Sequence, residues 1–119
     1  MIYGTGVDIT EVGRLRRAVE KWGESFLNRI FTQDELKAAR KRATMFQHLA
    51  GRFAAKEAVF KAMGEKDLAF KDFEILNDPD GKPVCKVVRG KKAKGVDILV
   101  SISHVKNYAV ASAIVTKKG

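Results

Sequence analysis

The hydrophobic pattern of this 119-residue chain changes its period at Gly64. Between residues 12 and 63, apolar side chains recur every three or four positions, which is the spacing of amphipathic helices. After Gly64 they alternate with polar side chains, as in half-buried strands, and a further strand-like segment occupies residues 2–7. Three helices followed by four strands, with one strand in front, predict an α+β fold in which a mainly antiparallel sheet packs with three helices.

The first predicted helix has two distinct faces. Its apolar face carries Val12, Leu15, Val19 and Trp22. Its basic face carries Arg14, Arg17 and Lys21. The segment is therefore an amphipathic helix with a cationic side.

The next two helices have recognisable ends. Thr32 and Glu35 form a capping-box pattern, so the second helix should begin near Gln33. The third helix should run from about Phe46 to Met63, with Gly64 ending it. Within it, "GRFAAKEAVFKAM" holds a glycine, Gly51, which costs about 1 kcal/mol relative to alanine and suggests close packing or close approach of a ligand.

The strands after Gly64 are predicted to form two hairpins. "FKDFEIL" and "VCKVV" are joined by "NDPDGKP", where Gly81 would supply a positive φ. "DILVSISHV" and "YAVASAIV" are joined by a short turn around Lys106 and Asn107, and the basic segment "RGKKAKG" between the hairpins is expected to be a loop.

Composition limits the function classes. The length and the absence of a Pro/Gly-rich linker predict one domain over residues 1–119, and no apolar run is long enough for a membrane span, so we expect a cytoplasmic protein. A net charge of +9 should attract an anionic partner, which could be nucleic acid, a membrane, a phosphorylated small molecule or an acidic protein. The single cysteine, Cys85, excludes an internal disulfide, and with two histidines any metal should be held mainly by carboxylates, as Mg²⁺ is.

Asp8 and Glu11 lie where the first strand meets the first helix, and two interpretations are open. Asp-x-x-Glu in this position is a helix-capping pattern, with Asp8 as N-cap and Glu11 as its reciprocal partner. Alternatively, Asp8 joins Glu57 of the third helix in an oxygen-ligand site for Mg²⁺. Glu57 and Lys61 could equally form a surface pair worth roughly 0.2–0.5 kcal/mol, or Lys61 could neutralise charge on a phosphate at that site.

The segment "SISH", residues 101–104, also has two interpretations. Its serines alternate with apolar residues, as on the polar side of a strand, and His104 could be an ordinary turn residue. As ligands, Ser103 and His104 at a strand end would suit phosphate oxygens.

Four segments together resemble one known family. They are "GTGVDITEV", "AGRFAAKEAVFKAMG", "DFEILNDPDGKP" and "VSISHVKNYAVA". In this order they resemble the holo-acyl-carrier-protein synthases, the small bacterial type of 4′-phosphopantetheinyl transferase. The resemblance covers nearly the whole chain and implies the transferase fold. The segment "AMGEKDLAF" departs from it, being shorter than in many relatives and lacking their later glycines, and Lys66 in it receives no role.

The resemblance implies a reaction and a set of site residues. A serine of apo-acyl carrier protein attacks the β-phosphorus of coenzyme A, which gives holo-acyl carrier protein and 3′,5′-ADP in fatty acid biosynthesis. Asp8 and Glu57 match the Mg²⁺ ligands, Lys61 matches the residue that contacts the phosphate and assists the leaving group, and Glu11 is left a supporting role. The remaining matches to coenzyme A-binding positions are Arg52, Asn77, Pro83, Ser103 and His104. Asp8 acting through a water is the favoured base.

The resemblance also implies partners. Carrier proteins of this type are acidic, so Arg14, Arg17 and Lys21 are expected to dock the carrier. A homotrimer with active sites at subunit junctions is expected, without membrane or nucleic acid. Two alternatives are a small basic nucleic-acid-binding domain and a carrier-binding protein that has lost catalysis. The nucleic-acid alternative rests on the net charge and on "RGKKAKG", whereas Asp8, Glu57 and Lys61 argue against lost catalysis.

Overall fold

The computed structural model describes residues 1–64, 67–90 and 95–118. In chain order the elements are β1 (Ile2–Glu11), α1 (Val12–Ile30), α2 (Gln33–Arg40), α3 (Met45–Met63), the short 3₁₀ helix η1 (Phe70–Asp72), β2 (Phe73–Asn77), β3 (Pro83–Val87), β4 (Val96–His104) and β5 (Tyr108–Lys117). The predicted α+β class is confirmed, and within these ranges the chain has three α-helices and only antiparallel strand pairs.

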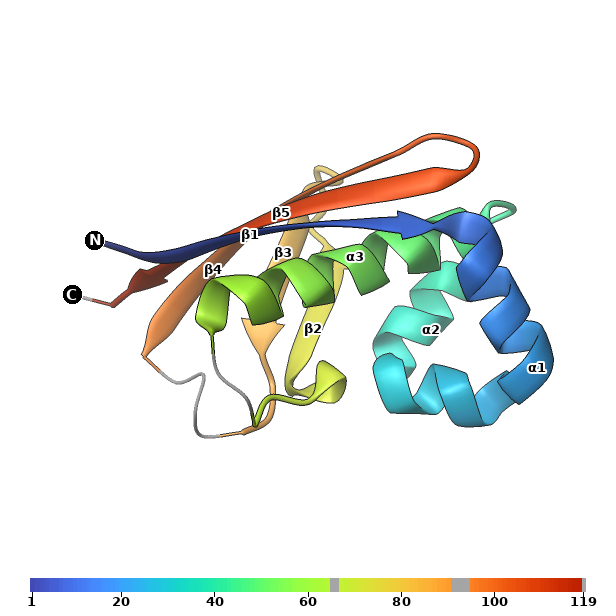
Figure 1. The fold of residues 1–119 in the computed structure, drawn as a ribbon, viewed down its shortest axis with the longest axis horizontal. Coiled ribbons are helices and arrows are strands. Elements are labelled where there is room, and N and C mark those ends of the chain that lie inside the picture. Colours follow the sequence, from blue (N-terminus) through green and yellow to red (C-terminus); the bar gives the residue numbers. More distant parts are fainter. Residues whose placement is uncertain (65–66, 91–94, 119) are drawn as a thin grey trace.

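The strands form two separate sheets. One has the order β1-β5-β4, and the other is the hairpin of β2 and β3. Helix α3 lies along the three-stranded sheet, while α1 and α2 gather at one end of it (Figure 1). Ala109, Ala111, Ala113 and Val115 of β5 are buried, and the last three pack in one core cluster with Ala54, Ala58 and Val59 of α3. A second cluster joins α1 and α2 to the start of α3.

Several local predictions are confirmed. Thr32 accepts a hydrogen bond from the Glu35 N–H, and Glu35 accepts one from the Thr32 N–H, so the capping box is present. Gly64 ends α3 with a φ of 69°, and Gly81 has a φ of 88° in the β2–β3 turn. Gly51 is explained by packing, because a Cβ there would lie 2.8 Å from the Ile102 side chain.

Three predictions about the elements are wrong. Strand β1 continues to Glu11 through pairing with β5, so Asp8 is a strand residue and not the N-cap of α1. Glu11 takes the N-cap position, but its side chain makes no capping hydrogen bond. Trp22, predicted on the apolar face, is 59% exposed, and the helix kinks at the next residue, Gly23, whose φ of 59° and ψ of −140° are not helical.

The third correction concerns the start of β2. Phe70–Asp72 form η1, so the strand predicted to begin at Phe70 begins at Phe73. No helix among the described residues is long and apolar enough to cross a membrane.

Candidate active site

Strand β1 lies in direct backbone contact with α3. A Cβ on Gly4 would lie 2.0 Å from the carbonyl oxygen of Ala62, and one on Gly6 would lie 2.0 Å from that of Ala58. Since no side chain fits between them, the strand approaches the helix more closely than strands with side chains allow. This contact brings Asp8, two residues after Gly6, to the helix face that carries Glu57 and Lys61.

Asp8 and Lys61 form an ion pair at the end of this contact. Lys61 Nζ lies 3.2 Å from Asp8 Oδ1 and donates a second hydrogen bond to the carbonyl of Val7 at 3.0 Å. The other carboxylate oxygen of Asp8 accepts a hydrogen bond from the Thr10 hydroxyl at 3.2 Å. The Asp8 side chain is largely buried while that of Lys61 is half exposed, so the carboxylate is fixed and the ammonium faces outward.

Glu57 stands beside this ion pair. Burial raises the pKa of its carboxyl group, and the negative charge of Asp8 raises it further, whereas Lys61 lowers it. Asp8 and Glu57 both line one cleft of about 570 Å³ between β1, α1 and α3, together with Glu11, Arg14 and Phe53. The predicted convergence of the two acids, which lie 49 residues apart in the sequence, is therefore confirmed.

The donor set suits a hard divalent cation. Two carboxylates that disfavour each other's charge are stabilised by a cation placed between them. Among the described residues, no group of three or more His, Cys, Asp or Glu side chains is arranged to hold a metal. Two protein carboxylates fit Mg²⁺, which keeps several waters and takes further oxygens from substrate phosphates.

A second polar cluster surrounds Arg52, further toward the start of α3. Arg52 is 7% exposed and donates from Nη2 to the Asn77 side-chain oxygen, and among the described residues its Nε finds no hydrogen-bond partner. Its pKa is lowered to about 10 by burial and by Arg42, whereas Glu35 raises it. The contact with Asn77 joins two of the predicted coenzyme A-binding residues, and Pro83 pairs with Asn77 across the β2–β3 hairpin.

The structure separates Ser103 from His104. Ser103 pairs with Val110 on the outer face of the three-stranded sheet, whereas His104 pairs with Ala109, whose side chain points to the buried inner face. Consistent with this, His104 lies close enough to His48 of α3 to lower the pKa of the His48 imidazole by charge repulsion. Within one chain, only His104 of this pair therefore belongs to the Arg52 cluster.

Sequence reasoning missed two members of this cluster. His48 is buried one helical turn before Arg52, and Arg42 lies between α2 and α3. Arg42 lowers the pKa of both His48 and Arg52, and Arg52 also lowers the pKa of His48. The i, i+4 spacing of His48 and Arg52 could have indicated a shared face, but nothing local places Arg42 there.

The predicted carrier-docking residues are exposed on α1. Arg14 also lines the cleft that holds Asp8 and Glu57, and Lys21 lies 4.8 Å above the ring of Trp22. Arg14, Arg17 and Lys21 thus present positive charge beside the cleft and along the helix leading away from it.

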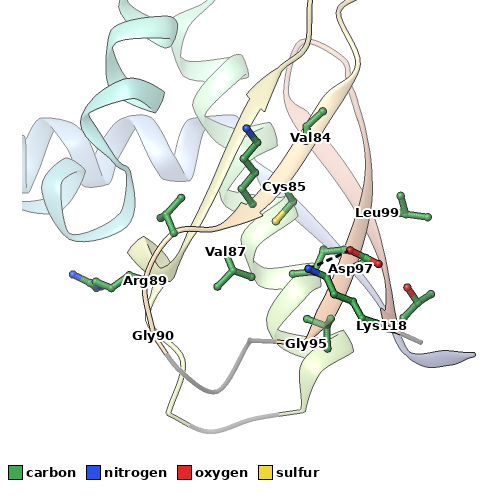
Figure 2. A pocket seen from close by; sticks show the side chains of 14 residues that line it. Val84, Cys85, Val87, Arg89, Gly90, Gly95, Asp97, Leu99 and Lys118 are labelled. Atoms are coloured by element: carbon green, nitrogen blue, oxygen red, sulfur yellow. Dashed lines mark ion pairs between the residues drawn. The ribbon is translucent and has the colours of Figure 1, made fainter.

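A larger cavity, of about 1060 Å³, lies elsewhere. Figure 2 shows it between β3 and β4, which belong to different sheets, with Arg89 and the Lys118–Asp97 ion pair at its rim. None of the predicted site residues lines it. Of the predicted loop "RGKKAKG", residues 91–94 lie outside the described part of the chain, as does Lys66 of the segment that departs from the family pattern.

Residues 4–113 match the model of the 4′-phosphopantetheinyl transferase superfamily. The chain belongs to this superfamily. As a transferase of this class it is an enzyme. The structure places Asp8 and Glu57 at one cleft. The family finding favours the enzymatic interpretation over the nucleic-acid-binding alternative.

Individual relatives agree with this assignment. The chain is 47% identical over 117 residues to a holo-[acyl-carrier-protein] synthase of Thermodesulfovibrio yellowstonii, covering 98% of this chain and 100% of the relative. It is 41% identical over 121 residues to the holo-[acyl-carrier-protein] synthase of Halothermothrix orenii, covering 96% of this chain and 97% of the relative.

Solved structures of holo-acyl-carrier-protein synthases also resemble this transferase. The Bacillus anthracis protein in complex with coenzyme A (3′,5′-ADP) is 35% identical, with a TM-score of 0.84 and coverage of 100% and 99%. The Helicobacter pylori protein in complex with coenzyme A is 28% identical, with a TM-score of 0.84 and coverage of 94% and 99%.

Proposed function

We propose that this transferase moves the 4′-phosphopantetheine group of coenzyme A to a serine of an apo-acyl carrier protein, in a Mg²⁺-dependent reaction. The observation that carries the proposal is the meeting of Asp8, Glu57 and Lys61 at one cleft. The relatives' names and their coenzyme A complexes support the choice of substrates.

Asp8, Glu57 and Lys61 have different roles in the proposed phosphoryl transfer. The serine oxygen forms a bond to the β-phosphorus, and the bond from that phosphorus to the oxygen of 3′,5′-ADP breaks. Asp8 accepts the serine proton through a water, and the Lys61 ammonium neutralises the oxygen that leaves. Asp8 and Glu57 would hold Mg²⁺, which when bound supplies positive charge to the diphosphate.

The Arg52 cluster is suited to another part of the same substrate. Arg52 lies buried at the end of the sheet where His104 is exposed, and among the described residues no carboxylate is hydrogen-bonded to Arg52, so an anionic group is the complementary ligand. We assign this cluster to a phosphate of coenzyme A, with Asn77 and Pro83 beside the nucleotide. Ser103, on the outer face, would reach a nucleotide bound at a junction with another subunit.

A homotrimer is part of the proposal. The outer face of the three-stranded sheet exposes large apolar side chains, including Val7, Ile9, Leu99, Val110 and Ile114. A contiguous apolar face of this kind is typical of a subunit interface.

From the family resemblance we further propose that the enzyme serves fatty acid biosynthesis in the cytoplasm. Light scattering tests the trimer, which Ile9→Glu should disrupt while Lys82→Glu, on a hairpin turn, should not.

The transfer itself is tested by mass measurement of apo-acyl carrier protein incubated with the enzyme, coenzyme A and Mg²⁺. A phosphopantetheine adduct is expected, and chelation of the metal should prevent it. Glu57→Ala should abolish transfer while leaving the fold intact, whereas Glu20→Ala, an exposed acid on α1, should not. Unchanged turnover of Glu57→Ala at saturating Mg²⁺ would rule out its role as a metal ligand.

Carrier docking is tested by the apparent KM. Replacing Arg14 and Lys21 by glutamate should raise the KM for the carrier far more than that for coenzyme A, because surface charges mainly steer encounter. Equal effects on both substrates would refute the docking role.

A further inference from the structure

Each oxygen of the Asp8 carboxylate accepts a hydrogen bond from another side chain in the described part of the chain. Lys61 Nζ donates to Oδ1, and the Thr10 hydroxyl donates to Oδ2, both at 3.2 Å. The Asp8 side chain is 17% exposed, so water can reach little of it. The orientation of this carboxylate therefore depends on the two donors.

The two donors differ in how firmly they can hold a carboxylate. Lys61 reaches Asp8 through a flexible four-carbon chain, and its side chain is 56% exposed. Thr10 lies two residues after Asp8 on the same strand, and its branched Cβ restricts the side chain to few rotamers. The Thr10 hydroxyl is therefore the more rigid of the two supports.

Strand β1 places Thr10 on the side of the cleft. Residues two apart in a strand share a face, so Gly6, Asp8 and Thr10 all point toward α3, the helix that a Cβ on Gly6 would strike. Both Asp8 and Thr10 pair with β5, which fixes their backbones. Thr10 also lines the cleft that holds Asp8 and Glu57.

We propose that Thr10 is a positioning residue for the metal site: its hydroxyl keeps the Asp8 carboxylate in one orientation beside Glu57. The metal itself, Mg²⁺, rests on the proposed function. In that function Lys61 must also reach the leaving oxygen, and Thr10 is then the donor that still holds Asp8. Removing a hydrogen-bond partner of a ligating side chain commonly weakens metal binding by about 10- to 100-fold.

Metal binding to the free enzyme tests this role without substrate. Mn²⁺ is the probe, because the EPR signal of the free ion reports how much is bound. Thr10→Val keeps the branched shape and removes the hydroxyl, and it should raise the Kd for Mn²⁺ about tenfold. Thr10→Ser restores the hydroxyl and should return the Kd close to the wild-type value. Thr116→Val, on β5 beside the β3–β4 cavity, is the matched control and should leave the Kd unchanged.

Transfer measured against Mg²⁺ concentration separates positioning from a structural role. In Thr10→Val the Mg²⁺ concentration for half-maximal transfer should rise about tenfold, and raising Mg²⁺ should restore transfer. A purely structural role would lower the rate at every Mg²⁺ concentration together with the melting temperature. That result would overturn the inference.

NMR observes the orientation of Asp8 directly and without a metal. The three-bond couplings across χ1 of Asp8 should report one rotamer in the wild type and in Thr10→Ser, and an average over several rotamers in Thr10→Val. Averaging in the wild type, or a single rotamer in Thr10→Val, would overturn the inference. If Thr10→Val does not fold, Thr10→Ala takes its place. If Mn²⁺ binding to the wild type is too weak to measure, the couplings decide.

An Mn²⁺ Kd of Thr10→Val equal to that of the wild type would also refute the role of Thr10, as would a failure of Thr10→Ser to restore binding. Failure of the proposed function gives a different result, because wild-type enzyme would then form no phosphopantetheine adduct. The couplings and the Mn²⁺ titration require neither coenzyme A nor carrier, so the two failures are distinguishable.

Discussion

Replacing Lys56 by methionine should remove a large part of the stability of the fold. Lys56 has no exposed side-chain surface, and its Nζ donates to Glu35 Oε1 at 2.7 Å, to the Ile30 carbonyl at 2.9 Å and to the Phe70 carbonyl at 3.0 Å. It thus ties α3 to the end of α1, the start of α2 and η1. Methionine of similar length leaves the Glu35 carboxylate buried without its counter-charge, and breaking such a pair costs about 3–5 kcal/mol.

Urea denaturation followed by circular dichroism measures this loss. The matched control is Arg40→Met, which breaks an ion pair of similar length, 2.9 Å to Glu24, between exposed side chains. The control should cost at most about 1 kcal/mol. Lys56→Met combined with Glu35→Gln should cost less than the sum of the single changes, because the double variant no longer buries an unpaired charge. A loss for Lys56→Met within about 1 kcal/mol of the control would refute the reasoning.

Three further changes test other parts of the structure. Gly6→Ala should lower the melting temperature and displace β1, since the new Cβ would lie 2.0 Å from the Ala58 carbonyl oxygen. The control Gly13→Ala should not, because a Cβ there would lie near only the flexible tip of an arginine side chain. Equal melting temperatures of the two variants would contradict the close contact. Thr32→Ala should cost about 1 kcal/mol of unfolding free energy by removing the cap of α2, and an unchanged urea midpoint would show that the cap contributes nothing. The pKa of His48 is about 4 when folded and 6.5 for an ordinary imidazole, so the unfolded chain takes up the proton first and stability falls between these pH values. His48→Gln should reduce that acid loss by roughly 3 kcal/mol, as seen in urea midpoints at pH 7 and pH 4; identical acid losses would argue against the buried neutral ring.

Elements with local signals could be predicted from the sequence. The capping box of Thr32 and Glu35 satisfies backbone groups within four residues, and Gly81 permits the backbone of a short turn. The change of period at Gly64 coincides with the end of α3. These signals depend on neighbours in the chain, so no knowledge of the fold is needed to interpret them.

Features set by distant pairing could not be predicted in the same way. Asp8 lies in a pattern that caps helices equally well, and only the pairing of β1 with β5, which places Asp8 opposite Ala111, keeps it in a strand. The burial of Lys56 depends on its ion pair with Glu35, which lies twenty-one residues away in the chain. The kink at Gly23, next to the exposed Trp22, likewise has no signal in the helical period.

Part of the candidate site could be predicted from the sequence and part could not. Residue type and the family resemblance were enough to name Asp8, Glu57 and Lys61, but their convergence required the contact between β1 and α3. His48 and Arg42 were missed because neither stands in a recognisable motif. Their significance follows from a shared environment with Arg52 and His104, which the folded chain creates.

The backbone contact between β1 and α3 has a consequence for how this enzyme tolerates change. Because Gly4 and Gly6 leave no side chain between strand and helix, the main chains of β1 and α3 are in direct contact near Asp8 and Glu57. Substitutions elsewhere in the core leave this contact between β1 and α3 in place. A methyl group added at either glycine would push the strand away from the helix and so move Asp8 away from Glu57. We therefore expect evolution to conserve Gly4 and Gly6 while the residues around this contact vary.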